Sequence, residues 1–555
     1  MTGHVVVIGG GVGGLATAAL LARGGADVTL VERHDTVGGR AGRLEVDGFT
    51  FDTGPSWYLM PEAFEHFFAL LGRRVEDELD LIDLDPRYRV FFERDDAPLA
   101  DVLDVTASSA DNRARFDEMS PGDGAAIDAY VSEATALYRL ALDRFLYTTF
   151  ERPLSVADRS LLPRLGSLAP LLTQSLGSRI AGKIRDPRLR QVLGFHAVFL
   201  GSSPDRIPSL FSLMSHLDLQ DGVRYPKGGL YAVIEALERA AIAEGVTIRT
   251  CADVKRIVVE RGRAVGVRLA DGETIAADAV VSSADMHHTE TELLEPEHQA
   301  RPARSWRKVR PGVSALLVMA GVEGELPELE HHSLFFTQDW EGNFKAIMER
   351  GGVPHPASVY VARTTATDPS TAPAGHENLV MLVPFPAEPT LGGTDASRAS
   401  MERHAARYLD QVGRWAGIPD LRARTSIKAM LTPSDFAQSL SAFRGGALGL
   451  EQTLMQSAMF RPRNISSKVS HLLYAGSSTA PGIGVPIVLI SAELVAKRLL
   501  GETSPHPLNT PLPAGYLARS RRRGALGDLS RALGAKRARP SGAGAAPDSP
   551  EQEAS

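Results

Sequence analysis

The stretch Val5-Val6-Val7-Ile8-Gly9-Gly10-Gly11-Val12-Gly13-Gly14 decides the fold of this chain. Residues 5–8 are apolar, β-branched and bounded by glycine, which is typical of a buried parallel strand. Gly9 and Gly11 allow a sharp turn and leave room for phosphates beside the backbone, and Gly14 lets the next helix pack closely on the strand. That helix, expected over residues 15–23, would aim its first N–H groups at the phosphates. The stretch therefore predicts a site for an ADP-bearing cofactor.

An acidic residue closes the next predicted strand. Residues 28–31 are apolar or β-branched, and Glu32 follows them. A carboxylate in this place accepts hydrogen bonds from the adenosine ribose, which argues against the 2′-phosphate of NADP. A glycine-rich turn alone is weak evidence in a chain with 52 glycines, but here a strand precedes it, a helix follows it and an acid ends the next strand. Gly38-Gly39-Arg40 resembles the second glycine pair of the flavoprotein amine-oxidase superfamily and favours FAD over NAD; for Arg40 alone, an ordinary surface arginine is a fair alternative.

Composition bounds the class of protein. With 555 residues, 43% hydrophobic and 23% charged, the chain can bury large cores in two or three structural units. The net charge of −7 gives no overall positive field, so nucleic-acid binding is not expected. Cys251 is the sole cysteine, which excludes intramolecular disulfides and a thiolate zinc cluster and fits a reducing cytoplasm. No run approaches the roughly 18 uninterrupted apolar residues of a spanning helix, and export is not expected.

The chain is expected to return twice to its cofactor domain. Strand-like runs between residues 246 and 281 follow a helix expected over 230–243, and they predict a small sheet grafted onto the nucleotide fold. Near the C-terminus, a strand over 471–475, a glycine-proline loop over 476–484 and a helix over 487–500 follow one another. The N-terminus of that last helix would stabilise negative charge on a reduced flavin.

Two long insertions separate these blocks. The first contains an expected hairpin around residues 93–98, a helix over 125–145 and a leucine-rich stretch over 161–176 broken by two prolines, which either covers the core or dips into a bilayer surface. We predict an α/β fold with a Rossmann-like FAD-binding domain, a mixed α+β substrate domain and a helical lid. The expected domain ranges are 1–87, 225–286 and 443–502 for FAD binding and 88–224 and 287–442 for the substrate region and lid.

Residues 503–555 are rich in proline, glycine, alanine and serine, and are expected to be a disordered basic tail. Its basic cluster would attract anionic lipid headgroups, although a solvated tail without a partner is an equal alternative. The cluster consists of Arg519, Arg521, Arg522, Arg523, Arg531, Lys536, Arg537 and Arg539. Truncation after Glu502 is accordingly expected to spare flavin binding.

Three further segments resemble those of the bacterial-type phytoene desaturases, FAD-dependent carotenoid dehydrogenases. They are GFTFDTGPSWYLMP at 48–61, YPKGG at 225–229 and YAGSSTAPGIGVP at 474–486. The last segment departs from many family members, because Ala480 stands where they have histidine and Ile483 where they have alanine. The departure leaves flavin binding in place and bears on the substrate and the number of desaturations.

The resemblance implies a peripheral membrane enzyme at the inner face of the cell membrane. It implies that a hydride passes from an allylic carbon of phytoene to FAD while the neighbouring carbon loses a proton, giving neurosporene or lycopene, with a quinone or oxygen as the electron acceptor. Alternatives on the same fold are a C30 precursor desaturase, a hydroxycarotenoid desaturase, a ketolase and an isomerase. An alternative of a different class is a prenyl-binding protein of the GDP-dissociation-inhibitor type, which uses no flavin.

The predicted cofactor-binding residues are Gly9, Gly11, Gly14, Glu32, Gly39, Arg40, Val254, Gly476, Gly482, Gly484 and Val485. Trp57-Tyr58 and residues 195–200 are candidate walls of a polyene channel, or equally core. His196, Asp218 and Asp52 lie in suggestive segments, but a lone buried polar residue more often has a structural role. We assign no catalytic residue and no metal ligand from the sequence.

Overall fold

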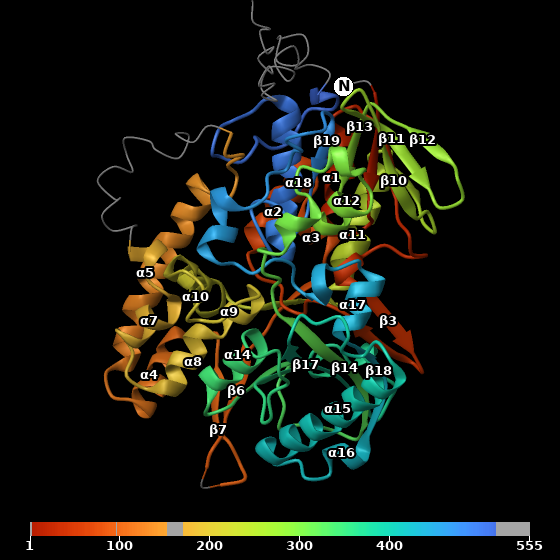
Figure 1. Cartoon of the computed structure of the whole chain (residues 1–555). Coiled ribbons are helices and arrows are strands. Elements are labelled where there is room, and N and C mark those ends of the chain that lie inside the picture. Colours follow the sequence, from red (N-terminus) through yellow and green to blue (C-terminus); the bar gives the residue numbers. More distant parts are fainter. Residues whose placement is uncertain (1–2, 96, 152–169, 518–555) are drawn as a thin grey trace, which may run out of the picture.

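A five-stranded parallel sheet forms the upper half of the molecule (Figure 1). The structure, a computed structural model, describes residues 3–95, 97–151 and 170–517. The strand order is β19-β13-β1-β2-β9, and three distant stretches of the chain supply the strands. These strands are β1 (His4–Ile8), β2 (Asp27–Val31), β9 (Thr247–Arg249), β13 (Ala279–Ser282) and β19 (Leu472–Tyr474).

Helices pack on this sheet and bury its glycine-rich turns. The central helix α1 (Val12–Arg23) is buried from Val12 to Leu21 and contacts α11 (Tyr231–Ala243) and α18 (Val485–Leu500). Helix α2 (Pro61–Leu70) packs against α18 in turn. The first strand, first helix, second strand and last helix thus lie close to their expected bounds.

A separate antiparallel sheet is attached beside the parallel one, with the order β10-β11-β12. Its strands are β10 (Val254–Glu260), β11 (Arg263–Leu269) and β12 (Thr274–Ala276). The sequence analysis placed the runs at 246–250 and 279–281 in this small sheet, but β9 and β13 pair in parallel with β2 and β1 instead. The pattern of apolar residues in a short run does not reveal which strand it will pair with.

The lower half of the molecule is a seven-stranded sheet with the order β18-β14-β17-β16-β15-β6-β7 (Figure 1). All neighbouring pairs are antiparallel except β15 and β6. Both insertions contribute, the first through β6 and β7 and the second through the other strands. The strands are β6 (Tyr88–Phe92), β7 (Asp101–Val105), β14 (Ser314–Glu323), β15 (His332–Phe336), β16 (Val359–Arg363), β17 (His376–Phe385) and β18 (Thr425–Leu431).

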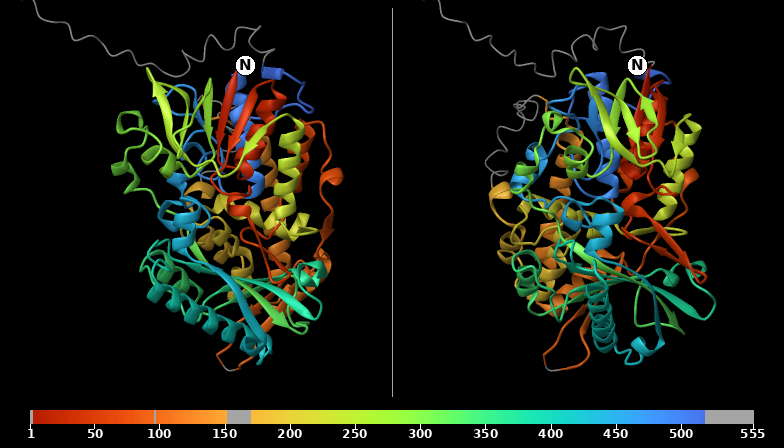
Figure 2. Two further views of the ribbon diagram at one scale, coloured as in Figure 1. Left: turned by 90° about the vertical axis from the view of Figure 1, so that its right-hand side faces the viewer. Right: turned by 45° about the vertical axis from the view of Figure 1, so that its right-hand side comes forward.

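The two faces of this sheet have different partners. Helix α15 (Asp395–Ala416) covers the outer face, where Tyr408 and Val412 pack against Leu316 and Val318 (Figure 2). The inner face faces a helical region on the left of Figure 1. That region contains α4 (Ser109–Met119), α5 (Asp123–Arg144), α7 (Leu176–Ala181), α8 (Pro187–Gly194), α9 (His196–Phe199) and α10 (Met214–His216).

Short ribbons and helices connect these layers. The ribbons pair β3 (Arg43–Val46) with β4 (Phe49–Asp52) and β5 (Leu81–Asp83) with β8 (Arg224–Pro226). The remaining α-helices of the described residues are α3 (Val75–Glu78), α12 (Met286–Thr291), α13 (Ala303–Trp306), α14 (Trp340–Met348), α16 (Leu421–Arg424) and α17 (Pro433–Ser439). The leucines at 161, 162, 165 and 168 lie outside the described residues.

The first part of the expected tail is packed. Leu512, Tyr516 and Leu517 are buried in the core that α1, α11 and α18 form with the parallel sheet. The Tyr516 hydroxyl donates to the Leu20 carbonyl at 3.1 Å, and the Gly515 N–H donates to the Arg23 carbonyl at 2.9 Å. These three apolar side chains stand in a proline-rich stretch, so its average composition does not reveal that it packs. We propose that the tail begins after Leu517 instead of at Thr503; its basic cluster lies outside the described residues.

Candidate functional site

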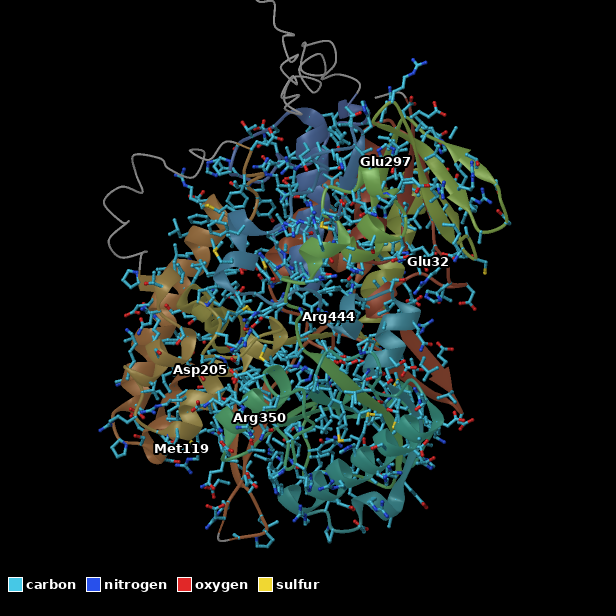
Figure 3. The ribbon with its side chains drawn as sticks, viewed as in Figure 1. Glu32, Met119, Asp205, Glu297, Arg350 and Arg444 are labelled. Atoms are coloured by element: carbon cyan, nitrogen blue, oxygen red, sulfur yellow. The ribbon has the colours of Figure 1, made fainter. Side chains whose placement is uncertain are left out.

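A cavity of about 600 Å³ connects the carboxyl ends of the parallel strands with the helical region and the inner face of the lower sheet. Its size is in the range of ligand-binding cavities, and its place is where open α/β sheets bind ligands. Glu32, labelled in Figure 3, lies at the lower edge of the upper sheet. Every predicted cofactor residue except Gly14 lines this cavity.

The N-terminus of α1 is open toward the cavity. Gly11 caps the helix without a side-chain hydrogen bond, and Gly11, Val12 and Gly13 all line the cavity wall. A Cβ atom on Gly11 would have no neighbour closer than 3.7 Å, so the protein does not crowd this position. A Cβ on Gly14 would overlap the Gly9 carbonyl oxygen, so Gly14 serves the packing of α1 on β1. Free N–H groups at a helix start suit a pyrophosphate.

The carboxylate of Glu32 is fixed in the cavity wall. Its Oε2 accepts the N–H of Gly10 at 2.7 Å and its Oε1 accepts the N–H of His34 at 2.9 Å. Each carboxylate oxygen has a further lone pair, so the group can also accept hydrogen bonds from a ribose. Val254 lines the same part of the cavity.

Arg40 is not an ordinary surface arginine. Its Nε donates to the Ala447 carbonyl at 3.1 Å, and its Nη2 lies 3.5 Å from an Asp285 carboxylate oxygen. Among the described residues this Nη2 has no hydrogen-bond partner, although it is shielded from solvent. A guanidinium nitrogen that is shielded from solvent and makes no hydrogen bond, next to Gly39 at φ +57°, fits a phosphate-bearing cofactor.

A second helix start, that of α18, also faces the cavity. We call the part of the cavity at the starts of α1 and α18 the cofactor end. Helix α18 begins after Gly484, which has φ +111° and provides no side-chain cap. Gly476, Gly482, Gly484 and Val485 line the cavity there. The two uncapped helix starts place positive ends of helix dipoles along one cavity, as the cofactor prediction required.

The opposite end of the cavity is apolar. It is lined by α5, by residues between 199 and 217, and by strands of the lower sheet. Of the predicted channel walls, Trp57, Phe199 and Leu200 line the cavity, whereas Tyr58 and residues 195–198 do not. The sequence analysis missed the contributions from α5 and the lower sheet, such as Leu137, Ala141, Ala315, Leu317 and Leu382.

None of the three polar candidates for a catalytic role lines the cavity. His196 and Asp218 are both buried, with 3.3 Å between His196 Nε2 and Asp218 Oδ1, and the Tyr88 hydroxyl donates to Asp218 Oδ2 at 2.7 Å. The Asp52 carboxylate accepts the N–H groups of Leu230 and Tyr231 at 2.7 and 3.1 Å and so anchors the start of α11. Burial raises the pKa of Asp52 to about 6.

One polar group does reach the cavity from the lower sheet. Tyr360 lines the cavity, and its hydroxyl hydrogen-bonds His332 Nδ1 at 2.8 Å. Trp57 stacks on the His332 ring with 4.5 Å between ring centroids. Burial lowers the pKa of His332 far below its usual value and raises the pKa of Tyr360, so both groups are neutral at pH 7. Residues this distant in the sequence give no local signal of their contact.

Comparison with known proteins agrees with this geometry. Residues 12–500 match the family of flavin containing amine oxidoreductases. The chain is 40% identical to the carotenoid 3,4-desaturase of Haloarcula japonica, over 89% of this chain and 98% of that protein. It is 37% identical to the zeta-carotene-forming phytoene desaturase of Myxococcus xanthus, over 90% and 94% of the two chains.

The fold also resembles solved structures. A Methanosarcina mazei oxidoreductase superposes with a TM-score of 0.59 at 20% identity, covering 89% of this chain and all of that one. The range matched by the family includes the predicted cofactor residues from Gly14 to Val485, whereas Gly9 and Gly11 lie just before it. The cofactor is FAD. The chain therefore belongs to the flavin-containing amine oxidoreductases and, within them, to the bacterial-type phytoene and carotenoid desaturases.

Proposed function

We propose that this FAD-dependent oxidoreductase desaturates a long hydrophobic polyene, with phytoene as the leading substrate and more conjugated carotenoids such as neurosporene or lycopene as products. The distribution of charge along the cavity carries the proposal. All Asp, Glu, Arg and His side chains that line it belong to the cofactor end, and the other end is lined by apolar and aromatic residues with a neutral Tyr360. An uncharged wall suits a hydrocarbon and gives an amine or a carboxylate no partner.

Bound FAD supplies the acceptor for the hydride taken from an allylic carbon. The residues of this chain would hold the cofactor at the two helix starts, keep one C–C unit of the polyene beside it and exclude water. Glu32 and Arg40 are proposed to bind the ribose and the pyrophosphate. We propose a quinone or oxygen as the electron acceptor. The rate at which each of them reoxidises the reduced protein tests which one it is.

A later carotenoid such as lycopene is a second candidate substrate, because the chain is 40% identical to a carotenoid 3,4-desaturase. One experiment tests both candidates. The chain is expressed in two hosts, one accumulating phytoene and one accumulating lycopene, and the pigments are compared with those of the empty hosts. New conjugated polyenes in the first host support phytoene desaturation and count its steps. Products only in the second host would replace phytoene by a later carotenoid, and unchanged pigments in both, with soluble flavin-loaded protein, would overturn the proposal.

We further propose that the enzyme binds the inner face of the cell membrane peripherally. None of the described helices is both long and apolar enough to cross a bilayer. Two short 3-10 turns, Leu454–Gln456 and Ala458–Phe460, expose Met455, Met459 and Phe460 by 66%, 54% and 47% beside the cavity, which Met459 also lines. Gln456 hydrogen-bonds the backbone of Arg310, which joins these turns to exposed basic side chains. Those side chains are Arg304, Arg307, Lys308, Arg310 and Arg463.

Such an apolar tip with basic neighbours matches an anionic bilayer surface. The double variant Met459→Ser, Phe460→Ser should pellet less with phosphatidylglycerol vesicles, whereas Ile242→Ser, which alters an exposed apolar residue on α11, should not. Equal pelleting of the double variant and the unaltered protein would remove these turns from the membrane contact.

A further inference from the structure

Arg461 is a buried cation without a carboxylate partner among the described residues. The residue is 2% exposed. Its guanidinium donates to the carbonyls of Thr479 at 2.9 Å and Gln456 at 3.0 Å, and also to the carbonyl of Ser477. Burial lowers the pKa of Arg461 to about 9, which leaves it charged at pH 7. Glu451, an acid in the same segment, is already bound by Arg206 at 2.7 and 2.9 Å.

The guanidinium is bonded to the glycine-proline loop over residues 476–484. Ser477 and Gly482 of that loop line the cavity, and Arg461 holds the loop through the Ser477 and Thr479 carbonyls. Asn464 adds a bond to the Ala480 carbonyl at 2.9 Å. Arg461 itself does not line the cavity, but its positive charge is bonded to the loop that leads into the N-terminus of α18.

Arg461 also fixes the side chain of Gln452. The Oε1 atom of Gln452 accepts from Arg461 Nη1 at 3.1 Å and from Ser457 Oγ at 2.9 Å. Since an arginine can only donate, the amide must present its oxygen to Arg461 and its NH₂ group away from it. Gln452 lines the cavity, its Nε2 has no partner among the described residues, and a Cβ built on Gly482 would lie 2.6 Å from that nitrogen.

We propose that Arg461 is a positioning residue that raises the reduction potential of the bound flavin, through its own charge and through the donor group of Gln452. This inference rests on the proposed placement of the flavin pyrimidine end at the start of α18. A flavin that accepts a hydride gains two electrons and one proton, and so one negative charge, which collects on the pyrimidine side. A preorganised donor, a helix dipole and a buried cation stabilise such a charge strongly where water is excluded. No carboxylate of the described residues pairs with Arg461 to offset its charge.

The test measures the midpoint potential of the flavin in Arg461→Met, which removes the charge and keeps most of the volume. We expect the ratio of reduced to oxidised flavin at a given potential to fall at least about tenfold, which is about 30 mV for a two-electron couple. Arg461→Lys keeps the charge, so its flavin midpoint potential should lie between those of the unaltered protein and Arg461→Met. Arg498→Met is the matched control, because Arg498 is equally buried but bonds the Thr149 carbonyl and Glu151 at the far end of α18.

An unchanged potential in a flavin-loaded Arg461→Met protein would overturn the proposal, as would an equal shift in Arg498→Met. If Arg461→Met holds no flavin, Gln452→Leu decides: a lowered potential supports the proposal and an unchanged one overturns it. The placement of the cofactor is judged separately by the flavin content of Gly11→Val. Normal flavin there would contradict the proposed site and leave the role of Arg461 without its basis.

Discussion

The two ends of the cavity are built in different ways. The cofactor end, at the starts of α1 and α18, is lined by many glycines together with Glu32 and Arg40. The polyene end consists of side chains from α5, from residues 199–217 and from the lower sheet. A dinucleotide imposes close backbone approach and a fixed spacing of residues, whereas a hydrocarbon requires only an apolar wall of the right shape, which many sequences can supply.

The largest expected effect, on flavin binding, is at Gly11 of the cofactor end. In Gly11→Val the new Cβ would make only ordinary van der Waals contact with the protein, the nearest atom being the Gly38 carbonyl oxygen at 3.7 Å, but the side chain would take up the space that we propose for the pyrophosphate. We expect a folded protein that retains less than about a tenth of the normal flavin, measured from its visible absorbance and thermal unfolding. Gly14→Val should instead unfold, since its Cβ overlaps the Gly9 carbonyl. A yellow, active Gly11→Val protein would contradict the assignment.

The polyene end can be blocked without touching the cofactor. Ala141 of α5 lines the cavity and is 6% exposed, so Ala141→Phe places a ring in the channel. Desaturation should fall at least about tenfold, because the reacting carbons can no longer reach their position, while the flavin content stays normal. Ala129→Phe on the exposed side of the same helix is the control. Loss of flavin in Ala141→Phe, or full activity, would show that the two ends are not separable in this way.

The difference between the two ends also explains what the sequence could predict. The strand, turn, helix and acid from Val5 to Glu32 are local, so their spacing predicts their structure and their ligand. The contact of Trp57 with His332 and Tyr360 depends on the pairing of strands far apart in the chain, and no short pattern contains it. His196 and Asp218 show the same limit, because their segments suggested a catalytic role that the sequence could not assign, and in the structure both side chains are buried and do not line the cavity. The 503–517 segment was misplaced because average composition outweighed Leu512, Tyr516 and Leu517.

That misplaced segment gives a smaller effect, on stability. Ending the chain after Leu517 should leave thermal unfolding unchanged within error. Ending it after Glu502 removes three buried apolar side chains, each worth about 1.5–3 kcal/mol, and the bond from Tyr516 to Leu20. We therefore expect a clear fall in melting temperature for the shorter chain only, in addition to the expectation that truncation after Glu502 spares flavin binding. Equal melting temperatures of the two shortened chains would support Thr503 as the start of the tail.

The smallest effect concerns Asp52, which the structure places at the start of α11 and not in the cavity. Burial raises its pKa to about 6 in the folded protein, so between about pH 4 and pH 6 the folded state binds more protons than the unfolded one. The free energy of unfolding should therefore decrease as the pH rises through this range, by up to about 3 kcal/mol for a shift of about two pKa units. Asp52→Asn should remove this slope, measured by urea unfolding at several pH values, and leave desaturation at pH 7.5 within about twofold. A base that took the substrate proton would have to face the polyene, and Asp52 does not line the cavity. A large loss of activity in Asp52→Asn, with unchanged flavin content and stability, would support a catalytic role for Asp52 instead.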